Sequence, residues 1–160
     1  MLRSLTTLVV CALFSAPALG DEKFVRLVNV DTGKVLAVAD DSDEAGARAV
    51  LAKLDKDNKA QQWELKKDDK HIALVNRKSG KVLDVYEDSK DEGGAIIIWD
   101  AKDEGVDNQR WSWVGDGKER RLKSKSSELV LDVGSNGEVV QKKQDDKAKG
   151  QLWEVVEVKK

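Results

Sequence analysis

Three short segments, Gln61-Gln62-Trp63, Gln109-Arg110-Trp111 and Gln151-Leu152-Trp153, repeat one pattern along the chain. Their tryptophans are 48 and 42 residues apart, and each triplet closes a similar preceding segment. Recurrence at such an interval is typical of proteins built from internal structural repeats. The sequence therefore predicts three copies of one unit, over about residues 24–70, 71–118 and 119–160.

The units also share an apolar segment with the pattern Val-Leu-x-Val, beginning at Val35, Val82 and Val130. Short apolar segments separated by Gly, Asn, Asp and Ser predict an all-β architecture with four strands in each unit. Residues 44–54 are rich in alanine and favour a helix by propensity alone. The equivalent segment of the second unit, residues 95–99, is typical of a strand, so we expect a strand in both places.

Residues 1–20 have the features of a secretory signal peptide. Arg3 precedes an apolar run over residues 8–14, and small residues lead to Gly20 before the first charged residues. This run is too short to span a bilayer. We therefore expect a secreted or periplasmic protein, with a single domain over residues 21–160.

The charged residues of the chain, 28 basic and 30 acidic, are interleaved and give a net charge of −2. This distribution lacks the basic face that nucleic acid or an anionic membrane would select. We therefore expect no nucleic-acid partner and no membrane insertion. His71 is the single histidine, Cys11 falls within the signal peptide, and no Gly-x-Ser-x-Gly motif occurs. We expect neither catalytic nor metal-binding residues, no cofactor and no enzymatic activity.

The Gln-x-Trp triplets, taken with the Leu-Asp-Val segments, resemble the repeats of ricin-B-type lectins over residues 24–158. The resemblance implies a β-trefoil, in which twelve strands, four per repeat, surround a pseudo-threefold axis. It also implies a carbohydrate-binding protein whose partners are glycans.

Comparison of the units separates scaffold from site. Trp63, Trp111 and Trp153 occur in every unit, so we expect them to fill the core. Trp113 has apolar counterparts in the other units and is expected to pack there too. Trp99 has no aromatic counterpart, since the equivalent positions fall within one residue of Lys53 and Lys142. A threefold scaffold does not require this tryptophan, which favours a sugar-stacking surface over a side chain that fills a gap beneath a loop.

The galactose-binding units of the family combine an aspartate, an aromatic residue, an asparagine and a glutamine. The matching residues are Asp84, Trp99, Asn108 and Gln109. The resemblance implies that Asp84 accepts hydrogen bonds from sugar hydroxyls, Trp99 stacks on the ring, Asn108 bonds a hydroxyl and Gln109 braces Asp84. Ile97 stands where the family often has glutamine, so the resemblance implies no polar contact there.

The other two units lack parts of this set. The first has Ala37 in place of the aspartate, and the third keeps Asp132 and Gln151 but has Gly150 in place of the asparagine. Neither has the aromatic residue, so the sequence favours one site, in the middle unit, with Asp132 as an acceptor for backbone N–H groups. Two alternatives are a secreted β-trefoil that binds protein, as an inhibitor or adaptor with Trp99 at its interface, and a purely structural envelope protein.

Overall fold

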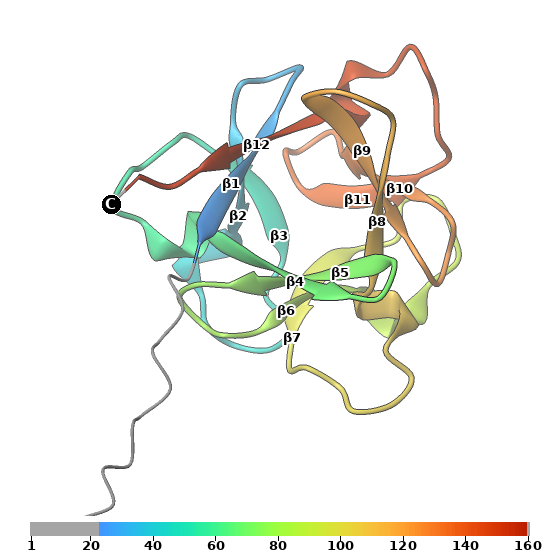
Figure 1. Ribbon diagram of the computed structural model, residues 1–160, viewed down its shortest axis with the longest axis horizontal. Helices are drawn as coiled ribbons and strands as arrows, with labels where there is room; N and C mark the ends of the chain where they lie inside the picture. Colours follow the sequence, from blue (N-terminus) through green and yellow to red (C-terminus); the bar gives the residue numbers. More distant parts are fainter. Residues whose placement is uncertain (1–22, 160) are drawn as a thin grey trace, which may run out of the picture.

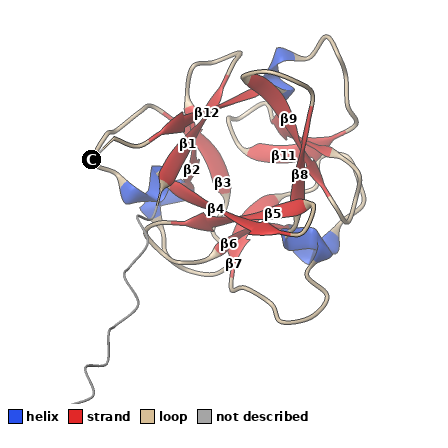
Figure 2. Cartoon of the chain, in the orientation of Figure 1, coloured by secondary structure: helices blue, strands red, loops and turns tan. Residues whose placement is uncertain are grey.

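The computed structural model describes residues 23–159, so the expected signal peptide lies outside the described residues. This part of the chain consists of strands joined by loops and short 3₁₀ helices (Figure 2). No helix within it is long and apolar enough to cross a membrane. The strands of the first unit are β1 (Phe24–Asn29), β2 (Val35–Val38), β3 (Ala49–Ala52) and β4 (Trp63–Asp68); those of the second are β5 (His71–Asn76), β6 (Val82–Val85), β7 (Ile96–Trp99) and β8 (Trp111–Val114); those of the third are β9 (Glu119–Ser124), β10 (Val130–Val133), β11 (Val139–Lys142) and β12 (Trp153–Glu157). The 3₁₀ helices are η1 (Ala39–Asp41), η2 (Lys59–Gln61), η3 (Tyr86–Asp88), η4 (Asp107–Gln109) and η5 (Lys149–Gln151).

Six of these strands close a barrel. In the order β12, β1, β4, β5, β8 and β9, each pairs antiparallel with the next, and β9 pairs back with β12. The other six form the hairpins β2–β3, β6–β7 and β10–β11. Isolated bridges join the hairpins to one another: Arg48 to Ile97, Val50 to Glu138, and Ala95 to Val140. The three units surround a common centre (Figure 1), which confirms the predicted β-trefoil.

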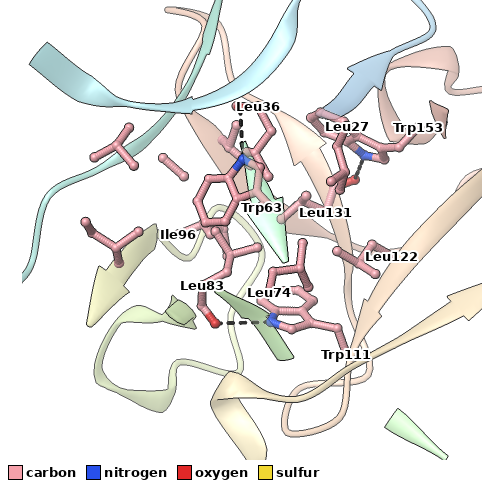
Figure 3. Packing of buried hydrophobic residues seen from close by; sticks show 14 of the residues in the cluster. Leu27, Leu36, Trp63, Leu74, Leu83, Ile96, Trp111, Leu122, Leu131 and Trp153 are labelled. Atoms are coloured by element: carbon pink, nitrogen blue, oxygen red, sulfur yellow. Dashed lines mark hydrogen bonds between the residues drawn. The ribbon is translucent and has the colours of Figure 1, made fainter. Parts of the chain in front are cut away.

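The tryptophans shared by the units lie at the centre of the core, as the sequence predicts. Trp63, Trp111 and Trp153 are each 0 % exposed. Each indole Nε1–H donates to the leucine carbonyl of its own Val-Leu-x-Val strand, at 3.1 Å for Trp63 and Leu36, 3.2 Å for Trp111 and Leu83, and 3.3 Å for Trp153 and Leu131 (Figure 3). Because a buried indole N–H needs a partner, this bond fixes each ring relative to a strand. Trp113 is partly buried and packs against this core, as predicted.

The alanine-rich segment of the first unit contains the predicted strand. It is β3, in which Ala49 is fully buried and pairs with Val38 of β2. Residues 43–47 before it form a loop rather than a helix. Helix propensity is a weak preference, and sheet pairing with burial in the core outweighs it.

Candidate functional site

A cavity of about 320 Å³ lies against the β6–β7 hairpin. Asp84 pairs with Ile97 across the hairpin, and Trp99 lies two residues further along β7. Because residues two apart in a strand point to the same face, all three face the same side of the hairpin. The cavity is lined by Asp84, Tyr86, Glu87, Ile97, Trp99 and Lys102. The structure thus brings Asp84 and Trp99, two of the four predicted site residues, to one cavity.

Asp84 is only 2 % exposed, and side-chain amides from η4 donate hydrogen bonds to its carboxylate. Its Oδ1 accepts from Nδ2 of Asn108 at 2.8 Å, and its Oδ2 accepts from Nε2 of Gln109 at 2.8 Å. Nζ of Lys102 lies 3.5 Å from Oδ2. Burial raises the pKa of Asp84, while the Gln109 hydrogen bond and the Lys102 charge oppose that rise. A carboxylate can accept about four hydrogen bonds, so Asp84 retains acceptor capacity for a ligand.

Asn108 bonds Asp84 but does not line the cavity. It is 2 % exposed, and its Nδ2 donates both to Asp84 and to the carbonyl of Val85, the latter at 3.1 Å. Its Oδ1 accepts from Nζ of Lys102 at 3.1 Å. With these contacts its amide positions the carboxylate and the ammonium group of the site.

Gln109 makes a contact that recurs in all three units. Its Oε1 accepts from the backbone N–H of Lys102 at 3.1 Å, and its Nε2 donates to the carbonyl of Asp100 at 2.9 Å. Gln61 and Gln151 make the equivalent pair of bonds to their own loops. The glutamine is therefore a scaffold residue that closes the loop before each triplet. In the second unit it also braces the site carboxylate, as the resemblance implies.

Trp99 is 39 % exposed, and the strand register places Ala52 and Lys142 at the equivalent positions. The first unit supports its ring. A Cβ atom added to Gly46 would lie 3.5 Å from the indole Cζ3 atom, so this glycine lies beside the ring. The N–H of Gly46 donates to the carbonyl of Ile98 at 2.8 Å, which fixes the loop beside β7. The indole thus lies where the loop of the first unit meets β7 of the second.

Three cavity residues were not predicted from the sequence: Tyr86, Glu87 and Lys102. Tyr86 is 44 % exposed, and Ala39 and Gly134 occupy its place in the other units. The comparison that singled out Trp99 would also have found Tyr86, which is likewise aromatic in one unit only. Glu87 has a φ of 52°, a left-handed conformation that is uncommon for residues other than glycine. We find no local sequence signal for Glu87 or Lys102.

The third unit anchors the loop that follows Tyr86. The side chain of Gln141 is fully buried, and its Nε2 donates to the carbonyls of Ser89 and Asp91 at 2.9 and 3.0 Å. Its Oε1 accepts from the hydroxyl of Ser127 at 2.6 Å. An apolar residue stands at this place in the other two units. Gln141 therefore joins the third unit to the loop of the site.

The other two units do not assemble an equivalent set. Ala37 is buried in the first unit. In the third, Asp132 accepts from Nε2 of Gln151 at 3.0 Å and from the backbone N–H of Val133 at 2.6 Å. The backbone bond agrees with the expected structural role of Asp132. Over residues 23–159, no cluster of three or more His, Cys, Asp or Glu side chains is arranged to hold a metal ion.

The barrel, the three hairpins and a cavity that combines a carboxylate with an exposed indole define a β-trefoil domain of lectin type. The model of the ricin-type beta-trefoil lectin domain-like family matches residues 12–99, more than half of the chain. The chain belongs to this family. No curated protein sequence matches it.

Solved structures share both the fold and part of the sequence. The designed threefold symmetric protein ThreeFoil is 31 % identical with a TM-score of 0.77, over 83 % of this chain and 97 % of ThreeFoil. The exo-beta-1,3-galactanase 1,3Gal43A from Clostridium thermocellum is 32 % identical with a TM-score of 0.76, over 85 % of this chain but only 30 % of the enzyme. A lectin from Polyporus squamosus, 18 % identical over 84 % of this chain and 48 % of the lectin with a TM-score of 0.70, shares the fold. Family and structural likeness together identify a lectin-like carbohydrate-binding module.

Proposed function

We propose that this protein is secreted and binds glycans through one galactose-type site in its middle unit. Asp84 and Trp99 contact the sugar, and Asn108 and Gln109 hold Asp84 in place. The observation that carries the proposal is that a buried carboxylate with free acceptor capacity and an exposed indole line one cavity. An indole face packs against the C–H-rich face of a pyranose. A carboxylate then orients the sugar hydroxyls through charge-assisted hydrogen bonds, which are about twice as strong as neutral ones.

Lys102 adds a cation to this site. Its ammonium group has three N–H donors, of which one is used on Oδ1 of Asn108 at 3.1 Å and another points toward Asp84. The third is free for a sugar hydroxyl. Ile97 supplies an apolar floor between the carboxylate and the indole, in place of the polar contact that glutamine would give.

The choice of galactose is supported by the Asp, Trp, Asn and Gln set and by one structural relative. The Clostridium thermocellum protein is named as an exo-beta-1,3-galactanase, and this chain matches 30 % of its length. We propose that the chain shares the binding role of a lectin-type module rather than catalysis. A single open site of this kind gives affinities on the order of millimolar, about −4 kcal/mol. Clustered glycans would then raise the effective affinity.

Titration of the protein with methyl β-galactoside, followed by NMR, tests the proposal. Asp84→Ala and Trp99→Ala should each abolish the chemical-shift changes while far-UV circular dichroism stays that of the folded protein. Asp132→Ala is the matched control, since it removes the equivalent carboxylate of the third unit, and should bind as the unaltered protein does. Absence of any galactoside binding, or binding indifferent to Asp84, would refute the proposal and favour the protein-binding alternative with Trp99 as an interface contact.

A further inference from the structure

The β6–β7 hairpin carries an aromatic side chain at each end of its cavity face. Trp99 pairs with Val82 in the register, and the N–H of Tyr86 donates to the carbonyl of Ala95 at 2.9 Å. Val82 and Tyr86 are four residues apart, a separation of about 13 Å along an extended strand. Asp84 lies midway between them. The carboxylate is thus flanked by an aromatic residue on either side, along the direction of the strands.

A single sugar over Asp84 and Trp99 would leave the part of the cavity beside Tyr86 unfilled, because Tyr86 and Trp99 lie at opposite ends of the hairpin face. The cavity volume of about 320 Å³ falls within the range of about 300–1,000 Å³ found for small-molecule sites. Among the described residues, four large apolar side chains are exposed, and two of them, Tyr86 and Trp99, line this cavity. Because Tyr86 has small counterparts in the other units, the threefold scaffold does not explain it.

The end of the cavity beside Tyr86 is acidic. Glu87 lines the cavity, whereas the carboxylate of Asp88, which follows it in η3, is paired with Lys90 at 2.8 Å, so the negative charge here is that of Glu87. Hydrogen bonding to Glu87, and then its negative charge, raise the pKa of the Tyr86 phenol, which therefore stays neutral at physiological pH. Carboxylates accept hydrogen bonds from sugar hydroxyls but repel a sugar that carries its own carboxylate. This end of the cavity thus favours a neutral sugar.

We propose that the cavity holds two consecutive residues of a neutral oligosaccharide, the first on Trp99 over Asp84 and the second on Tyr86 beside Glu87. This inference rests on the proposed function and names the class of glycan that the same site takes. It makes Tyr86 a specificity residue, which distinguishes a disaccharide from a monosaccharide.

Isothermal titration with methyl β-galactoside, lactose and β-1,3-galactobiose tests the inference. The unaltered protein should bind at least one disaccharide about 5- to 10-fold more tightly than the monosaccharide, as expected for one further aromatic contact. Tyr86→Ala should remove most of that advantage, and Tyr86→Phe should keep it. Leu54→Ala, which truncates an exposed apolar side chain outside the cavity, is the control and should leave the ratio of affinities unchanged.

Charge supplies a second readout. A disaccharide whose second residue is a uronic acid should bind more weakly than lactose, and Glu87→Gln should reduce this difference in affinity. Two results would overturn the inference: disaccharides that bind no more tightly than methyl β-galactoside, or a Tyr86→Ala protein that loses the same factor for all three sugars. Failure of all three sugars to bind the unaltered protein would instead refute the proposed function itself.

Discussion

Replacing Trp111 with alanine should lower the free energy of unfolding by about 4–5 kcal/mol. The indole is 0 % exposed, and truncating a fully buried aromatic residue typically costs about 3–5 kcal/mol. The loss of its Nε1–H also leaves the carbonyl of Leu83 without that partner, which places the cost in the upper part of this range. Trp63 and Trp153 have the same burial and the same bond, so their alanine variants should lose similar amounts. Trp99→Ala should cost about 1–2 kcal/mol, because a 39 % exposed ring leaves no closed cavity behind.

Urea unfolding followed by far-UV circular dichroism measures these losses without relying on the tryptophan fluorescence that the mutations remove. With a slope of about 1.5–2 kcal/mol/M, Trp111→Ala should lower the midpoint by about 2–3 M, and Trp99→Ala by about 1 M or less. If Trp111→Ala does not fold, Trp111→Phe should still lose more unfolding free energy than Trp99→Phe. Equal losses at Trp99 and Trp111 would contradict the division between scaffold and site.

Four further outcomes follow from contacts around the cavity. Gly46→Ala should weaken galactoside binding in an NMR titration, because the φ of 91° at this position disfavours a side chain and strain there would shift the loop beside the Trp99 indole. Gln141→Leu should weaken the affinity for a disaccharide and change the urea midpoint only slightly. It removes the hydrogen bonds to the loop after Tyr86 but keeps an apolar side chain in the core. As the pH is lowered, the affinity for galactoside should begin to fall above the pH range in which an ordinary aspartate titrates. The raised pKa of Asp84 makes its carboxylate take up a proton there and lose acceptor capacity. The same raised pKa works in the opposite direction on stability. The folded state binds this proton more tightly than the unfolded chain, so the Asp84 contribution to unfolding free energy increases as pH falls through the folded pKa, and the Asp84→Ala protein should lack that contribution.

Much of the scaffold could be predicted because a threefold fold places the same demands on each unit. Trp63, Trp111 and Trp153 fill equivalent places in the core, and the sequence shows this as a repeat. The same comparison located Asp84 and Trp99, whose residue types are not shared by all units. It would also have located Tyr86, had every unique aromatic residue been considered rather than tryptophan alone.

The sequence by itself determined the three units, their strands and the unit that carries the candidate site. Only the tertiary structure decided how that site is supported, because its contacts cross between units. Gly46 of the first unit lies beside Trp99, and Gln141 of the third holds the loop that follows Tyr86. Asn108 turns inward to its buried partners instead of lining the cavity. Repeats compare equivalent positions, whereas contacts between unlike positions arise when the chain packs, and no periodicity in the sequence records them.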